Sequence, residues 1–280
     1  EPEVLCVSGK WGVGKTYTWN HFLKQAKDNK QISLKHYAYV SLFGLKTLND
    51  LRYSLFEATR PIEKIGEPFE WGDFKEKGVV AALERPVRRA LTYVSRMSRI
   101  QNVIGATESI LFSSVKNQLV CIDDLERAGS GLDVMDVFGL ISFLKEQRGC
   151  RVILLLNQEE IKAEQKAVFD KQFEKVVDTH LYFEPTPAEA ADIVFPAPTG
   201  VGVDLRNHCV TLGIVNIRVI KKIEKICIRL VEILKDKYPG LVYQALHSAT
   251  LFAWSKYQKD SAPPPMEFLK DMGRLHGLFR

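Results

Sequence analysis

Short apolar runs recur along much of the chain, each bounded by polar residues, glycine or proline. Runs of this length are typical of buried strands, and the one that begins at His36 also alternates in polarity and is rich in aromatic residues. All of them are far shorter than the roughly 20 apolar residues that cross a bilayer. The predicted strands are residues 4–7, 36–42, 118–122, 151–156 and 179–183.

Between these strands, apolar residues recur at the three- and four-residue spacing of amphipathic helices. Either Thr47 or Asn49 is expected to cap one of these helices, and Asp133 is expected to cap another, which Gly149 ends. The predicted helices are residues 17–27, 48–57, 79–99 and the segment that follows Asp133.

From Pro185 onward the pattern is helical alone, with predicted helices at 204–212, 216–237 and 241–259. The longest of these has apolar residues on one face and lysine and arginine on the other, which predicts packing against a core. Its predicted buried face consists of Ile220, Ile223, Ile226, Leu230 and Ile233 or Leu234.

The alternation of strands and helices predicts an α/β fold with a parallel sheet between layers of helices. The purely helical pattern that follows predicts a second domain, so the predicted domains are 1–184 and 185–280. Residues 60–78 lack periodicity and are predicted as a loop, while 100–115 fit neither pattern. Together with helix 79–99 they form a predicted insertion at about 60–115.

A glycine-rich segment follows the first strand and precedes the first helix. Residues 9–16 read Gly-Lys-Trp-Gly-Val-Gly-Lys-Thr and match the phosphate-loop pattern Gly-x-x-x-x-Gly-Lys-[Ser/Thr]. Glycines let backbone amides curl around phosphates, and the helix adds its positive N-terminal end. Lys15 is expected to reach the β- and γ-phosphates, and Thr16 to hold Mg²⁺. The predicted nucleotide contacts are Gly9, Gly12, Val13, Gly14, Lys15, Thr16 and Tyr17.

Two carboxylates, Asp123 and Asp124, end the predicted strand 118–122. Because the carboxyl ends of parallel strands line the ligand crevice, these acids are expected beside the bound phosphates. Asp123 is the predicted Mg²⁺ partner, and Asp124 is predicted to orient or deprotonate the attacking water. The alternative is that the acids merely begin a loop, which is less consistent with a chain that also has the phosphate loop.

Two further residues are candidates for catalysis. Asn157 ends strand 151–156 at the same predicted edge, where it would bond the γ-phosphate or the water; alternatively it only starts a turn. Arg218 begins the longest C-terminal helix, where a helical lid could bring a guanidinium to the phosphates; alternatively it is a surface arginine.

Taken together, these motifs resemble the KAP family of P-loop NTPases, relatives of the AAA+ and STAND ATPases. The most specific element is Asp-Asp-Leu-Glu-Arg at 123–127, which is similar to the family's Asp-Asp-Leu-Asp-Arg; Asn216-Ile217-Arg218 resembles the start of its lid helix. The chain departs from the family in having Asn157 where Asp is frequent and in having no transmembrane helices in the insertion. Any segment that precedes the first strand is expected to belong to a longer protein.

The resemblance implies an AAA+-like P-loop fold with a C-terminal helical lid, ATP with Mg²⁺ as cofactors, and a role as a switch or assembly ATPase in a larger protein of antiviral-defence type. It also implies a homo-oligomer with an effector domain or partner protein. Arg127 would reach into a neighbouring subunit's site, or form a salt bridge to Asp123 or Glu126 in its own chain. GTP is disfavoured, since residues 157–160 do not match Asn-Lys-x-Asp.

Composition adds few constraints. The five cysteines are scattered and odd in number, which disfavours disulfides or zinc and is consistent with a reducing cytoplasm. The net charge of +5 is too mild to indicate nucleic acid. Arginines between Arg85 and Arg99 form a basic stripe, which is either a solvated helix face or a docking surface for an acidic partner or nucleic acid. The chain, which starts without Met, is expected to be part of a longer protein.

The leading hypothesis is therefore an Mg²⁺-dependent ATPase in which nucleotide state sets the position of the lid. One alternative is a scaffold that binds ATP without hydrolysing it, since Asp124 is shorter than the glutamate common at that position. A second alternative is a small-molecule kinase, and a third is direct nucleic-acid binding through the basic stripe.

Overall fold

The computed structural model describes residues 1–67, 112–258, 263–269 and 271. These residues form two compact units. The α/β unit contains Glu1–Gly9 and Lys15–Tyr182, and the helical unit contains Lys10–Gly14 and the chain from Phe183 onward. The expected helix 79–99 and its basic stripe lie outside the described residues.

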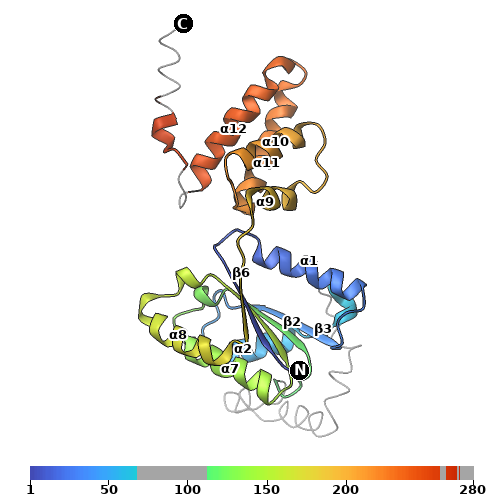
Figure 1. Cartoon of the computed structure of the whole chain (residues 1–280), viewed down its shortest axis with the longest axis vertical. Helices are drawn as coiled ribbons and strands as arrows, with labels where there is room; N and C mark the ends of the chain where they lie inside the picture. Colours follow the sequence, from blue (N-terminus) through green and yellow to red (C-terminus); the bar gives the residue numbers. More distant parts are fainter. Residues whose placement is uncertain (68–111, 259–262, 270, 272–280) are drawn as a thin grey trace, which may run out of the picture. The chain divides into compact units, whose positions relative to one another are not determined.

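The α/β unit is built on one sheet (Figure 1). Its strand order is β3-β2-β4-β5-β1-β6. All neighbouring strands are parallel except β2 and β3, which pair antiparallel at one edge. The expected parallel α/β fold is confirmed. The strands are β1 (Val4–Ser8), β2 (His36–Ser41), β3 (Arg60–Pro61), β4 (Leu119–Asp123), β5 (Arg151–Leu156) and β6 (Thr179–Tyr182).

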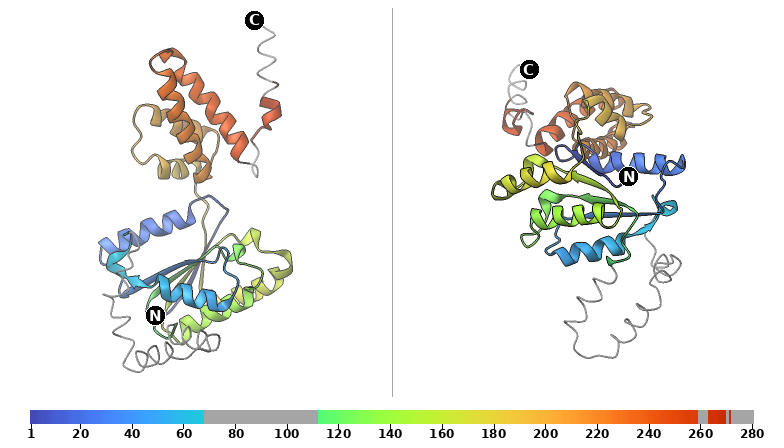
Figure 2. Two further views of the ribbon diagram at one scale, coloured as in Figure 1. Left: turned by 180° about the vertical axis from the view of Figure 1, so that it is seen from behind. Right: turned by 60° about the horizontal axis from the view of Figure 1, so that its bottom comes forward.

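Helices cover both faces of this sheet (Figure 2). Side chains alternate along a strand, so Leu155 of β5 packs with Leu23 of α1 on one face, while Leu154 belongs to the core beneath Ile141 of α7 on the other. This two-sided covering explains why the central strand β4 is buried at every position. The covering helices are α1 (Lys15–Asp28), α2 (Leu48–Ala58), α7 (Val134–Glu146) and α8 (Ala163–Val176).

Local sequence signals set the ends of these helices. Thr47, not Asn49, caps α2: its hydroxyl accepts from the Asp50 amide, and the Asp50 carboxylate accepts from the Thr47 amide. Asp133 caps α7 as expected, by accepting from the Met135 amide.

Two elements differ from the sequence-based expectations. The predicted loop 60–78 begins with β3 and a 3₁₀ turn at Ile62–Lys64; Pro61 is tolerated in β3 because an edge strand can dispense with one amide donor. The first C-terminal helix is α9 (Pro187–Val194), well before the expected start at residue 204. Thr186 and Glu189 form a capping box there, with Pro187 in the first turn.

The helical unit has its own hydrophobic core, formed where α9, α10, α11 and α12 pack together. On α11 the buried face runs through Ile220, Ile223 and Cys227. The expected members Ile226 and Ile233 are instead 38% and 69% exposed, because apolar residues occupy more than one face of this helix. The remaining helices are α10 (Val201–Thr211), α11 (Ile217–Leu234) and α12 (Val242–Tyr257).

None of the helices in the described part of the chain combines the length and apolar character that a membrane-spanning helix needs.

Candidate nucleotide site

The phosphate-loop segment connects the end of β1 to the start of α1. Gly12 and Gly14 have φ angles of 80° and 106°, a region that side chains with a Cβ rarely adopt. The Gly9 amide donates to the Leu156 carbonyl at the end of β5 (3.2 Å), and the Lys15 ammonium donates to the Gly9 carbonyl (2.6 Å). The segment thus has glycines in conformations that an anion-binding loop uses, and its lysine lies at the first turn of α1.

Residues 10–14 of this segment belong to the helical unit, and their contacts there are specific. The Ile217 amide donates to the Gly12 carbonyl (2.8 Å), and the Asn216 side-chain amide donates to the Trp11 carbonyl (3.5 Å). A Cβ added at Gly12 would lie 2.3 Å from the Asn216 Oδ1 atom. Gly12 is therefore required both by its φ angle and by the close approach of Asn216.

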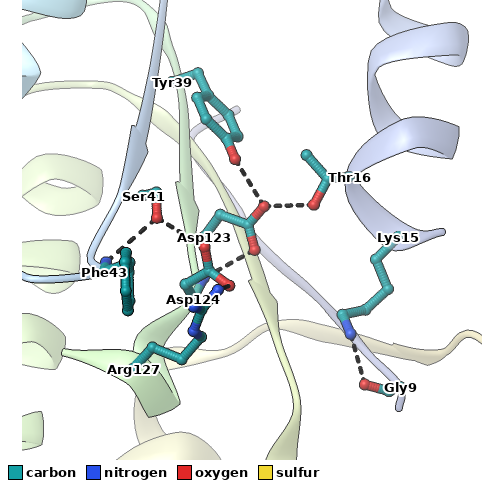
Figure 3. Close-up of polar contacts among 9 residues, drawn as sticks. All are labelled: Gly9, Lys15, Thr16, Tyr39, Ser41, Phe43, Asp123, Asp124 and Arg127. Carbon is teal, nitrogen blue, oxygen red and sulfur yellow. Dashed lines mark hydrogen bonds and ion pairs between the residues drawn. The ribbon is translucent and has the colours of Figure 1, made fainter. Parts of the chain in front are cut away.

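Asp123 is the last residue of β4 and is almost fully buried, with 4% of its surface exposed. Two hydroxyls donate to its Oδ2 atom, from Thr16 at 2.6 Å and from Tyr39 at 2.9 Å (Figure 3). Its Oδ1 atom accepts from the Asp124 amide at 2.8 Å. Burial raises the pKa of Asp123, and the hydrogen bond from Thr16 opposes that rise. Burial and the nearby charge of Asp123 raise the pKa of Tyr39, which keeps its phenol protonated as a donor.

Asp124 adopts a left-handed backbone conformation, with φ 60° and ψ 40°. The Ser41 hydroxyl donates to one of its carboxylate oxygens (2.7 Å), and the Arg127 guanidinium contacts the other at 3.5 Å. Arg127 also lies over the Phe43 ring, 3.9 Å from its centroid (Figure 3). The expected salt bridge of Arg127 within its own chain therefore exists, but its partner is Asp124 and not Asp123 or Glu126.

Asn157 follows β5, which lies between β4 and β1 in the sheet. It therefore shares the carboxyl edge of the sheet with Asp123. Its side chain is 4% exposed, and its Oδ1 atom accepts from the Glu159 amide at 3.3 Å, as in the turn-forming alternative.

The other expected site residues have different surroundings. Val13 is buried and Tyr17 is 46% exposed on α1. Arg218 is exposed in the first turn of α11, where its amide donates to the Asn216 side chain, and it belongs to the helical unit. The structure therefore brings together Lys15, Thr16, Asp123 and Asp124 in the α/β unit.

Sequence reasoning missed Tyr39 and Ser41, the two β2 residues that contact the paired acids. Strand β2 pairs with β4 so that Ser41 lies opposite Asp123 and Tyr39 lies opposite Cys121. A polar residue at the carboxyl end of a predicted parallel strand was a usable signal for Ser41. Nothing in the sequence distinguished Tyr39 from the other aromatic residues of its strand.

The donor atoms of this site fit a magnesium ion shared with phosphate. Mg²⁺ is usually bound through one or two protein oxygens together with waters and substrate phosphates. The Thr16 hydroxyl donates its proton to Asp123, so its lone pairs are available to a cation. Among the described residues, no group of three or more His, Cys, Asp or Glu side chains could hold a metal by itself. The site therefore suits a cation that arrives with a nucleotide.

The parallel sheet, the glycine loop between β1 and α1, and the buried acid at the end of β4, which β5 separates from β1, define a P-loop NTPase. The model of the KAP family P-loop domain matches residues 1–186 of this chain. The chain therefore belongs to the KAP family of P-loop NTPases, as the sequence motifs indicated. No match is found among curated proteins.

Similar solved structures are found at low sequence identity. The ORC2 protein of Aeropyrum pernix, in ADPNP and ADP complexes, is 14% identical, with 93% of this chain and 63% of that chain covered and a TM-score of 0.56. The Aeropyrum pernix ORC1 protein in complex with DNA is 14% identical (94% and 68% covered, TM-score 0.42), and a Thermotoga maritima RuvB mutant is 13% identical (82% and 57% covered, TM-score 0.36). The chain is thus similar in fold to ORC2 and spans less than two thirds of its length.

Proposed function

We propose that this chain binds ATP together with Mg²⁺ and hydrolyses its terminal phosphoanhydride bond. The observation that carries the proposal is the 2.6 Å hydrogen bond between Thr16, which follows the loop lysine, and the buried carboxylate of Asp123. It joins the phosphate-loop segment to the acid that the chemistry requires. The ADPNP and ADP bound by the ORC2 protein support adenine as the base.

Each part of the site has a role in this proposal. The backbone amides that follow Gly9, up to Thr16, would bind the phosphates, while the Gly9 amide stays bonded to the Leu156 carbonyl. The Lys15 ammonium would move from the Gly9 carbonyl to the β- and γ-phosphates. Thr16 and Asp123 would hold Mg²⁺, which supplies positive charge against the charge that develops on the phosphates. Val13 and Tyr17 complete the proposed nucleotide contacts.

Water attack on the γ-phosphorus would release ADP and phosphate. Asp124 would accept a hydrogen bond from that water and orient it, while Ser41 and Arg127 restrict the movement of its carboxylate. Asn157 would contact the γ-phosphate or the water from the end of β5. We propose that Arg218 reaches the phosphates when nucleotide binds, so that nucleotide state sets the conformation of the helical unit.

The test is to measure nucleotide binding and phosphate release in the same preparations. Lys15→Ala is expected to abolish ATP binding, because its ammonium is the main cation for the phosphates. Asp124→Asn is expected to bind ATP with near-normal affinity and release phosphate at least tenfold more slowly, since the amide is a poorer acceptor for the water's proton. Lys24→Ala, which changes an exposed lysine of the same helix, is the control. Unchanged turnover in Lys15→Ala or Asp124→Asn contradicts these roles.

One observation favours a second candidate, an ATP-binding scaffold without hydrolysis. Both carboxylate oxygens of Asp124 already have a partner, Ser41 or Arg127, so two of its roughly four lone-pair positions are occupied and the carboxylate is restrained from moving toward the water. Tight, Mg²⁺-dependent ATP binding with no steady-state phosphate release would establish this alternative.

The wider setting is also a proposal and follows from the family. We propose that the domains are 1–184 and 185–280, with an insertion at about 60–115. We also propose that the chain self-associates in the cytoplasm and acts with an effector domain or partner protein in a system of antiviral-defence type. Light scattering with and without ATP tests self-association. If ATPase-dead subunits lower the activity of wild-type subunits on mixing, Arg127 or another residue acts across subunits.

A further inference from the structure

We propose that Tyr39 is a positioning residue for the magnesium site: its hydroxyl fixes the Asp123 carboxylate so that one oxygen lone pair is kept for the cation or for a water bound to it. The inference rests on the proposed function and adds to it a residue outside the family motifs on which that function depends.

The hydrogen bonds to Asp123 determine which of its lone pairs remains available. An ionised carboxylate offers about four lone-pair positions, two on each oxygen. Oδ2 accepts from both Thr16 and Tyr39, and Oδ1 accepts from the Asp124 amide (Figure 3). The three donors therefore leave one position, on Oδ1. Without the Tyr39 hydroxyl, Oδ2 would also have a free position and the carboxylate could present either oxygen to the cation.

Tyr39 is well placed to hold the carboxylate because it lies on a rigid element. It belongs to β2, which is paired with β4 from Tyr37 to Ser41. Its pairing partner is Cys121, two residues before Asp123, so Tyr39 is a diagonal neighbour of the carboxylate on the sheet. Thr16 lies instead in the first turn of α1, directly after the phosphate-loop segment. Tyr39 is thus the donor attached to the sheet, and Thr16 is the donor attached to the phosphate-binding segment.

Tyr39→Phe is the direct test because it keeps the ring and removes only the hydroxyl. A hydrogen bond to a charged group is strong enough that its loss is expected to lower the apparent Mg²⁺ affinity about tenfold. The measurement is nucleotide binding as a function of Mg²⁺ concentration, by calorimetry with ATP analogues, alongside nucleotide affinity in EDTA. We expect a shift in the Mg²⁺ midpoint and no change in the affinity measured in EDTA.

Tyr37→Phe is the matched control. Tyr37 lies two residues earlier in β2, and its hydroxyl accepts from the Trp19 indole instead of contacting Asp123. This variant is expected to keep the wild-type Mg²⁺ midpoint. Equal shifts in the two variants would mean that the strand is disturbed in general, and no shift in Tyr39→Phe would mean that the hydroxyl does not position Asp123. Either result overturns the inference.

The outcomes also separate this inference from the proposed function. Absence of nucleotide binding by the wild-type protein overturns both. Binding without phosphate release removes the ATPase proposal only, since the Mg²⁺ midpoint still reports on Tyr39. Normal wild-type hydrolysis with an unchanged Tyr39→Phe midpoint removes this inference and leaves the ATPase.

Discussion

Asp124 is held in a conformation that most residues avoid. Its φ of 60° is in the left-handed region, which costs an ordinary residue roughly 1–2 kcal/mol, whereas Asp and Asn adopt it more readily. Its carboxylate is restrained by Ser41 and Arg127. The residue type at this position is therefore constrained by backbone shape as well as by the chemistry proposed for the acid.

This constraint predicts different stabilities for three substitutions at position 124. Asp124→Asn should unfold at nearly the same denaturant concentration as the wild type, because Asn tolerates the backbone and can still accept from Ser41. Asp124→Ala should lose about 1–2 kcal/mol of unfolding free energy through backbone strain and the lost hydrogen bond. Asp124→Gly relieves the strain, so it should be more stable than Asp124→Ala. If Asp124→Ala is as stable as Asp124→Gly in urea titrations, backbone strain at position 124 does not set the cost.

How much of the site could be predicted depends on how local its signals are. The loop residues Lys15 and Thr16 and the acid Asp123 follow from short motifs next to recognisable strands. The contacts of Tyr39 and Ser41 depend on the register of β2 against β4, which no short motif encodes. The pairing of Arg127 with Asp124, and not with Asp123 or Glu126, depends on side-chain geometry that no short motif encodes.

Among the elements, the central strands were the easiest to predict from sequence. Very short strands and helices with apolar residues on more than one face were the hardest. Continuous apolar runs identified β4 and β5, because strands covered on both faces carry apolar residues throughout. The two-residue strand β3 is too short for periodicity to reveal it. On α11 the predicted buried face was right for Ile220 and Ile223 and wrong for Ile226 and Ile233, because isoleucines occupy more than one face of this helix. The capping box that begins α9 was readable in the sequence.

Helix α11 begins at a residue with two separate contacts. The Asn216 Oδ1 atom accepts from the Arg218 and Val219 amides, and its side-chain amide donates to the Trp11 carbonyl. The first contact caps the helix and the second connects its start to the phosphate-loop segment. Two substitutions can separate them.

Asn216→Ala is expected to destabilise the helical unit by about 1 kcal/mol, the usual cost of losing an N-cap. Asn216→Asp keeps an equally good cap but lacks the amide donor, so it should retain the stability of α11 and lose only the contact to Trp11. Thermal unfolding, with amide exchange at Val219 and Ile220, measures the difference. Similar losses in both variants would show that the Trp11 contact matters more than the cap.

Considered as a whole, the molecule has an unusual division at its phosphate-loop segment. The chain leaves the α/β unit after Gly9 and returns to it at Lys15, and the residues between belong to the helical unit. The main chain of this segment is therefore divided between the two units. Sequence patterns indicated a helical domain after Pro185 but gave no sign that residues 10–14 would group with it, because that grouping arises from tertiary contacts such as Ile217 to Gly12.

This division predicts that nucleotide stabilises both units and not the α/β unit alone. A ligand at a hundredfold excess over its dissociation constant stabilises the folded protein by about 2.7 kcal/mol. If the segment transmits this gain, amide exchange should slow in β4 and also in the first turn of α11 when ATP and Mg²⁺ are added. Lys15→Ala should show neither effect. Protection confined to β4 would mean that the contacts of Gly12 and Trp11 with α11 do not couple the helical unit to the nucleotide. If both β4 and α11 are protected in the wild type, and Asn216→Asp loses the protection of α11 alone, the Asn216 side chain is part of that coupling.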